Sequence, residues 1–355
     1  MSMPPEVSGR RASRISRLFP LRALASGLSL AHNATTSSVF YISLLLVLIL
    51  VVFTVITPSG TFLTAFNLQT LATDASVVLL FAVGATLVII TGGIDLSQGA
   101  VATLAGAITV DIMKSLDGST GHPWLAIAIG ASVGIAVGAA WGAVNGWLVA
   151  VGRLNSFVVT LGGFAAALGA ARLLTSGRTV SGTPTELTDS IGLGLVVGIP
   201  VPFLISIFIV SVFGVMLART RKGEHLYLLG SNEEAARRSG IDIRRQYFTV
   251  YLYSGMLAGV AGVITVARFS GVSVTTGQLT EMLTALTGVV IGGASLAGGV
   301  GVMLGSVVGI FIPTVLNNGF VIMRVERFWQ EVAVGVLLVA AVAFDQSRRR
   351  AAANA

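Results

Sequence analysis

Residues 91–99, which read TGGIDLSQG, place one carboxylate between two long apolar runs. An ionised acid at membrane depth costs at least about 2.5 kcal/mol, so such acids usually face a cavity or a partner. Asp95 could therefore line a path for a polar solute. It also precedes an apolar run, and Asp is favoured at the start of a helix. Both interpretations, helix capping and a role in a transport path, stay open.

Other polar side chains stand within or beside apolar runs. Helix packing and interfacial anchoring explain them as well as a path does. The residues that we take as candidates for a transport path are Asp95, Gln98, Asn155, Thr160, Glu281 and Asn317. Asn145, Asn318 and Arg268 are further polar residues of the same kind.

Charge is concentrated in residues 219–247, where eleven of 29 side chains are charged. Within this island the sequence predicts a short helix, with Ser231 as the N-cap and Glu234 completing a capping box. Two acid-first pairs are spaced four residues apart, Glu233 with Arg237 and Glu234 with Arg238. A glycine suited to the left-handed residue that ends a helix follows at position 240.

A helix of about two turns is marginal in water, so this one must dock on something. One interpretation is a solvated loop between two membrane spans. The other is a docking surface for a soluble partner. The residues of this candidate surface are Ser231, Asn232, Glu233, Glu234, Ala235, Ala236, Arg237, Arg238, Ser239 and Gly240.

Composition excludes an ordinary soluble domain. The 355 residues are 54% hydrophobic and 10% charged, against about 25% charged residues in soluble domains. Strict alternation of the kind a membrane barrel needs is missing from the apolar runs. The sequence therefore predicts an all-α, polytopic membrane protein. It has no cysteine, which excludes disulfides and thiolate-bound metals.

Ten apolar runs predict about ten transmembrane helices, several of them short or broken. The predicted spans are residues 39–57, 67–90, 97–113, 124–151, 155–174, 202–218, 248–267, 281–296, 300–317 and 331–344. We expect a basic cytoplasmic tail at 1–38, a membrane domain at 39–345 containing the charged loop 219–247, and a cytoplasmic tail at 346–355.

The basic residues agree with this count. The N-terminal tail, the island and the C-terminal Arg triplet hold 15 of the 22 Lys and Arg residues. An even number of crossings puts all three on one side, which the positive-inside rule assigns to the cytoplasm. The net charge of +7 therefore indicates loop bias and not a nucleic-acid partner.

Glycines recur in two patterns. A four-residue ladder runs through 130, 134, 138, 142 and 146, which lets a neighbouring backbone approach closely, either inside a bundle or at a seam between subunits. The motif GGIDLSQG at 92–99 is echoed by GGASLAGG at 292–299. The match is short, so one interpretation is chance in a glycine-rich chain. The other is two pseudo-repeated halves, because glycine-broken segments at matching places are typical of a transport path. Six predicted spans between the copies make them a parallel pair.

Enzyme signatures are missing. The sequence has no G-x-x-x-x-G-K-[ST] phosphate loop and no H-E-x-x-H motif. We expect no catalytic residue, bound cofactor or metal on this chain. An ATP-hydrolysing engine, with its ATP and Mg²⁺, would belong to a partner.

Four segments together resemble one family. Residues 229–271 and 291–320, with TGGIDLSQGAVATLAGA at 91–107 and NSFVVTLGG at 155–163, are similar to bacterial ABC-importer permeases of the ribose, xylose and galactose class. The resemblance runs from about residue 67 to 344. The related branched-chain amino acid permeases share the general fold, but GGIDLS fits the sugar branch better. Gln98 departs from the family pattern, which often has a small residue there.

The resemblance implies a permease in the bacterial inner membrane that moves a monosaccharide by alternating access. Its implied partners are two cytoplasmic ABC ATPase subunits, an extracytoplasmic sugar-binding protein and a second permease copy, either identical or a sister chain. The helix at 231–240 would be the coupling helix held by the ATPase. Rival functions are an ion-coupled secondary transporter, a passive channel, or an ABC permease for branched-chain amino acids or nucleosides.

Overall fold

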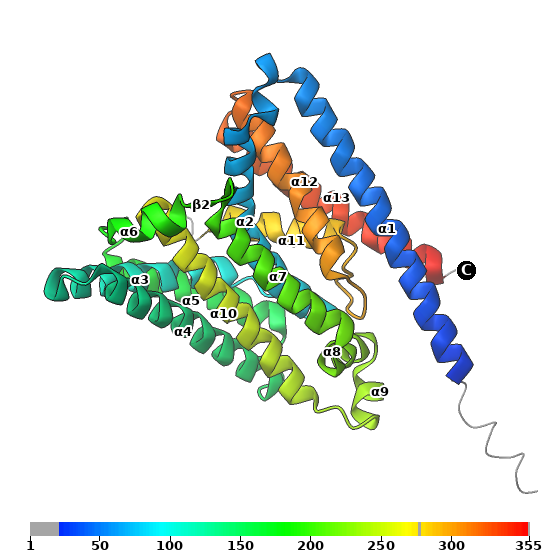
Figure 1. Ribbon diagram of the computed structural model, residues 1–355. Helices are drawn as coiled ribbons and strands as arrows, with labels where there is room; N and C mark the ends of the chain where they lie inside the picture. The colour runs from blue at the N-terminus through cyan, green and yellow to red at the C-terminus, as the bar shows by residue number, and fades with distance from the viewer. Residues whose placement is uncertain (1–20, 276–277, 354–355) are drawn as a thin grey trace, which may run out of the picture.

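The protein is an all-helical bundle, as the sequence predicts (Figure 1). The computed structural model describes residues 21–275 and 278–353. The long helices are α1 (Leu21–Ile56), α2 (Ala65–Ile90), α3 (Gln98–Thr120), α4 (Pro123–Ala150), α5 (Ser156–Thr175), α7 (Val201–Arg219), α10 (Ile243–Phe269), α12 (Met303–Ile322) and α13 (Arg327–Ala353). The shorter ones are η2 (Pro58–Leu63), α6 (Thr185–Leu187), η3 (Thr188–Gly192), α8 (Arg221–Ser231), α9 (Glu233–Arg238) and α11 (Leu279–Ile291).

Among the described residues, nine helices are long and apolar enough to cross a membrane. Helix α11 has only 13 residues and matches the eighth predicted span, so it is the short helix that the sequence anticipated. The other nine predicted spans each correspond to one of these long helices, and the crossing by α11 stays a prediction. Helix α1 differs at its start, because it begins at Leu21 and not at residue 39. Part of the expected tail therefore continues the first span as helix, and residues 1–20 lie outside the described chain.

Helix α2 forms the centre of the bundle. Its spanning segment is almost wholly buried and is apolar on every side, which is the pattern of a helix enclosed by other helices. Helices α7, α10, α11 and α12 pack around it. Helices α1 and α13 lie at the outside of the bundle and leave most of their apolar side chains exposed.

The glycine ladder of α4 faces other helices of the same chain. A Cβ at Gly142 would overlap the carbonyl oxygen of Tyr251, and one at Gly138 would overlap that of Gly255, both on α10. Nearer the N-terminus of α4, Gly130 faces Met113 and Thr109 of α3. The ladder is thus used for tight packing inside the bundle, the first of its two predicted uses.

One end of the bundle is closed by connections among α2, α10 and α12. The side-chain amides of Asn67 and Asn318 exchange two hydrogen bonds of 3.0 and 2.9 Å. The Arg268 guanidinium lies 2.6 Å from the Asp74 carboxylate. Two short antiparallel pairs lie here, β1 (Val180–Ser181) with β4 (Gly271–Val272) and β2 (Leu195–Val196) with β3 (Ile199–Pro200).

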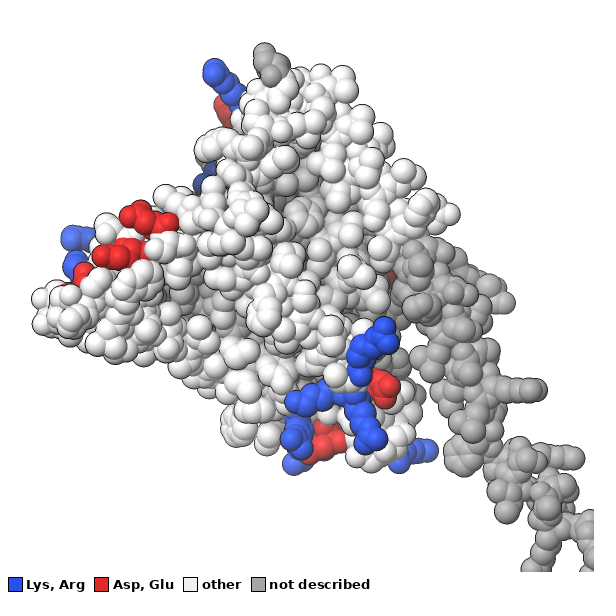
Figure 2. Space-filling model, viewed as in Figure 1, with Lys and Arg blue, Asp and Glu red and all other residues white. Residues whose placement is uncertain are grey.

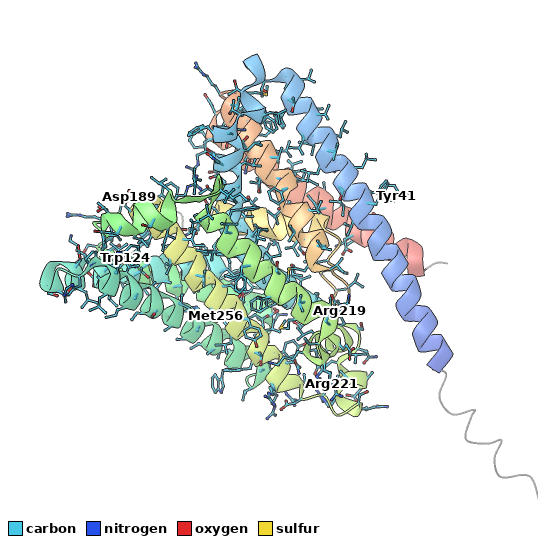
Figure 3. The ribbon with its side chains drawn as sticks, viewed as in Figure 1. Tyr41, Trp124, Asp189, Arg219, Arg221 and Met256 are labelled. Atoms are coloured by element: carbon cyan, nitrogen blue, oxygen red, sulfur yellow. The ribbon has the colours of Figure 1, made fainter. Side chains whose placement is uncertain are left out.

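The opposite end carries the charged island. Figure 2 shows charged side chains gathered at the ends of the visible face, with a broad uncharged zone between them. Arg219 and Arg221 lie at the α7–α8 junction, whereas Trp124 and Asp189 lie at the far side of the bundle (Figure 3). Both ends carry basic and acidic side chains, so the cytoplasmic placement of the island stays a prediction from the positive-inside rule.

Candidate functional site

The predicted helix of the island exists as α9, but a different residue caps it. The Asn232 side-chain oxygen accepts a 2.9 Å hydrogen bond from the backbone N–H of Ala235. The prediction that Ser231 is the N-cap is wrong. Ser231 is instead the last residue of α8, and its hydroxyl donates to the carbonyl of Tyr227 at 2.8 Å. The chain turns one residue later than the capping-box pattern indicates.

Both predicted ion pairs of α9 are present. Arg237 lies 2.6 Å from Glu233, and Arg238 lies 3.1 Å from Glu234. All four side chains are about half exposed or more, so each pair contributes only about 0.5 kcal/mol. The ion pairs therefore fix the positions of the charged side chains on the outward surface of α9 and add little to the stability of the helix.

The end of α9 anchors it to the bundle. Gly240 has a φ of +81°, as predicted, and its N–H donates to the carbonyl of Arg237. The N–H of Ile241 donates to the carbonyl of Ala236, which completes a Schellman motif. Ala236 and Ile241 are buried with Leu229 of α8 in one apolar cluster. One side of α9 is therefore fixed, while its charged side is free for a partner.

Helix α8, which the sequence reading missed, connects α9 to the transmembrane helices through glycines. A Cβ at Gly230 would overlap the carbonyl oxygen of Ile90 at the end of α2. A Cβ at Gly298 would lie 2.8 Å from the Gly230 carbonyl oxygen and 2.9 Å from the Gly92 backbone. The Gly299 N–H donates to the Ile90 carbonyl at 2.8 Å. We call Gly92, Gly230, Gly298 and Gly299 the glycine joint.

The two halves of the predicted repeat meet at this joint. Asp95 accepts from the N–H of Ser97, two residues on, and Ser295, its counterpart in the repeat, accepts from that of Ala297 in the same way. The backbones differ one turn earlier, because the left-handed residue is Gly92 in one motif and Gly293, not Gly292, in the other. The α2–α3 and α11–α12 loops thus share part of their local geometry and lie side by side against the end of α8.

Asp95 is the centre of a buried polar network. Its Oδ1 accepts from the Ser97 N–H at 2.9 Å and from the Ser97 hydroxyl at 2.7 Å. Its Oδ2 accepts from the Ser254 hydroxyl of α10 at 2.6 Å. Asn145 of α4 donates to Ser97, and Gln98 of α3 donates to Ser254. Burial raises the pKa of the Asp95 carboxyl, and the hydrogen bonds from Ser254 and Ser97 act against that rise.

The network fixes the α2–α3 loop to three neighbouring helices. Asn145 of α4 bonds Ser97, and Ser254 of α10 bonds Asp95. The Ile94 N–H donates to Ser156 and its carbonyl accepts from Thr160, both on α5. Asp95 does not cap α3 directly, because that helix begins at Gln98 and Asp95 closes an Asx turn in front of it.

The six candidate path residues separate into two groups. Asp95, Gln98 and Thr160 are brought together in the buried polar network. Asn155 caps α5 by accepting from the Phe157 N–H at 2.9 Å, while Glu281 in the first turn of α11 and Asn317 on α12 take no part in the network. Sequence reasoning missed the roles of Ser97, in the α2–α3 loop, and of Ser254, within α10, since a single serine carries no spacing signal of its own.

Among the described residues, no group of three His, Cys, Asp or Glu side chains could hold a metal ion. The site thus has three parts, which follow one another from the surface to the interior. They are the exposed charged helix α9, the glycine joint and the buried hydrogen-bonded network around Asp95. This arrangement can transmit a displacement of α9 to α2, α10 and α11.

Residues 67–342 match the family described as branched-chain amino acid transport system / permease component. The chain belongs to this permease family. A relative is the ribose import permease protein of Escherichia coli K12, 37% identical over 308 residues that cover 86% of this chain and 93% of the relative. The D-allose transport system permease protein of the same strain is 35% identical and covers 85% and 90%. The xylose transport system permease protein of Haemophilus influenzae is 32% identical and covers 87% and 96%.

No solved structure matches this permease with significance. The relatives named for sugars support the sugar branch of the resemblance over the amino-acid branch that the family description mentions.

Proposed function

We propose that this chain is the membrane-spanning subunit of an ATP-binding-cassette importer for a monosaccharide. The observation that carries the proposal is α9, a capped and ion-paired helix whose charged side faces outward while Gly230 beside it contacts two transmembrane loops. The relatives named as ribose, allose and xylose permeases supply the substrate class. As a membrane-spanning subunit, the chain is not itself an enzyme.

The proposed partners follow from the two ends of the bundle. Cytoplasmic ABC ATPase subunits, which hold the ATP and Mg²⁺, dock on residues 231–240. An extracytoplasmic sugar-binding protein docks at the opposite end, and a second permease copy completes the path. The protein crosses the bacterial inner membrane several times, and we place both termini in the cytoplasm, with membrane lipid around the exposed apolar helices.

The proposed mechanism is alternating access driven through the glycine joint. Closure of the ATPase dimer moves α9 and α8 together, because their apolar cluster is shared. Because Gly230 has no side chain, its backbone packs directly against the Ile90 carbonyl, and a displacement of α8 is passed to α2 and to the α11–α12 loop. The Asp95 network then carries it to α4, α5 and α10.

This mechanism divides the candidate path residues by role. We propose that Asp95, Gln98 and Thr160 position the α2–α3 loop, since their polar atoms are hydrogen-bonded to other residues of the bundle. Glu281 and Asn317, which are only partly buried, remain our candidates for the path, with Asn155 at its cytoplasmic mouth.

Uptake of labelled ribose, allose and xylose in cells tests the proposal. We expect uptake of at least one of these sugars to require the permease, its partner ATPase and its binding protein together. Uptake that survives deletion of the ATPase and follows an ion gradient would favour a secondary transporter. Competition by leucine or a nucleoside, without competition by sugars, would favour the other ABC substrates.

A further inference from the structure

A cleft of about 590 Å³ opens beside α9, between the start of α10 and the α4–α5 connection. Arg153 lines it from the α4–α5 connection, Arg244 from the first turn of α10, and Arg237 from α9. Its inner wall includes Gly92 and Gly93 of the α2–α3 loop. The cleft is thus continuous with the outward surface of α9 and reaches the loop at the glycine joint.

Two of these arginines are unpaired. Arg237 is neutralised by Glu233, but within the described chain neither Arg153 nor Arg244 has an ion pair or side-chain hydrogen bond. Asp242 also lines the cleft, and its Oδ1 accepts from the N–H of Arg245 as the cap of α10. The cleft therefore presents two free guanidinium groups, while both of its acids, Glu233 and Asp242, already have partners.

The two unpaired arginines reach the cleft from different elements. Arg153 lies in the α4–α5 connection, with a φ of +52°, a left-handed conformation that non-glycine residues seldom adopt. Arg244 stands in the first turn of α10, where the helix dipole disfavours a positive charge. Both guanidinium groups therefore line one cleft without an acidic partner of their own among the described residues.

We propose that the cleft binds an acidic side chain of the ATPase subunit, as a second contact beside α9. Paired guanidinium groups suit a carboxylate, which they bind through charge-assisted hydrogen bonds. The proposal rests on the proposed function, because it takes the ATPase as the partner of α9. We favour the ATPase over a lipid headgroup because the cleft shares Glu233 and Arg237 with the docking helix.

A bound carboxylate would also touch the moving parts. Gly93 in the cleft wall backs onto α10, since a Cβ there would lie 2.5 Å from the Tyr251 hydroxyl. The occupant would thus contact α10 and the α2–α3 loop at once. Through this contact the ATPase would bind the α2–α3 loop directly, in addition to acting on α2 through α9 and Gly230.

The test uses the full-length permease in lipid nanodiscs and measures its affinity for the purified partner ATPase subunit. The variant Arg153→Gln/Arg244→Gln removes both free cations of the cleft. The control Arg221→Gln/Arg245→Gln removes two island cations that do not line it. We expect the cleft variant to lower affinity about tenfold at low salt and the control to change it less than threefold. The cleft variant should also weaken the salt dependence of binding.

The outcomes separate this inference from the function on which it rests. Equal affinities of the cleft variant and the control would overturn the inference and leave the function standing. A failure of the unaltered permease to bind the ATPase would overturn both. A loss seen only in discs with phosphatidylglycerol, and not in phosphatidylcholine alone, would assign the cleft to lipid and overturn the inference. Size-exclusion profiles of each variant verify that it is folded.

Discussion

At the scale of single residues, Asp95 shows how a buried carboxylate can be stable without a cationic partner. Its two oxygens accept three hydrogen bonds, from the N–H and hydroxyl of Ser97 and the hydroxyl of Ser254. A buried acid is tolerated when its acceptors are satisfied. The network fixes the loop between two membrane helices, and we therefore propose that Asp95 acts on transport by positioning this loop.

Replacing Asp95 tests that role. Asp95→Ala leaves three donors without an acceptor and should lower the apparent melting temperature of the purified permease strongly, because each unsatisfied buried group costs about 1–3 kcal/mol. Asp95→Asn keeps one acceptor oxygen and should lower it less. Asp111→Asn, at an exposed acid of α3, serves as the control. Equal melting temperatures for Asp95→Ala and the control would contradict a structural network.

At the scale of elements, the position of α9 and its two ion pairs were predicted from the sequence, because both depend on local spacing. The capping residue was predicted wrongly, since Ser231 and Asn232 are both good N-caps and the choice between them depends on where α8 ends. Helix α8 itself depends on contacts with Ile90 and Gly299, which are distant in the sequence. Non-local packing of this kind leaves no periodic signal.

The corrected cap makes a measurable difference. Asn232→Ala removes the acceptor for the Ala235 N–H and should destabilise α9 by about 1 kcal/mol. Ser231→Ala removes only a bond to the Tyr227 carbonyl within α8 and should have little effect. Trypsin cleavage after Arg237 and Arg238 in inside-out vesicles reports this opening, with about fivefold faster cleavage expected for Asn232→Ala. Faster cleavage in Ser231→Ala would contradict this assignment and support Ser231 as the N-cap of α9.

At the scale of the whole molecule, the sequence predicted ten crossings, and the bundle has nine long helices and the short α11 among its described residues. Apolar length and the distribution of basic residues carry that information. The position of the two glycine motifs side by side could be guessed from their repeat, but their contact with α8 could not. For Asp95 the sequence left helix capping and a path role open, and the structure excludes direct capping of α3. The bond from Ser254 on α10 could not be predicted, because it depends on packing between segments that are distant in the sequence.

The sidedness of the bundle can be measured with single cysteines, since the sequence contains none. We expect Glu234→Cys to react with a membrane-impermeant maleimide only from the cytoplasmic side. Asp189→Cys, at the opposite end, should react only from outside. Labelling of both positions from one side would contradict the topology.

The most direct test of transmission through α8 is the number of sugar molecules moved per ATP hydrolysed. It is measured in proteoliposomes that hold the permease with its ATPase and binding protein. Gly230→Ala places a methyl group against the Ile90 carbonyl, so we predict continued ATP hydrolysis with at least a tenfold lower transport ratio. Gly118→Ala, where a Cβ meets no other atom within 4 Å, should keep the normal ratio. A normal ratio in a folded Gly230→Ala permease would contradict transmission through the glycine joint.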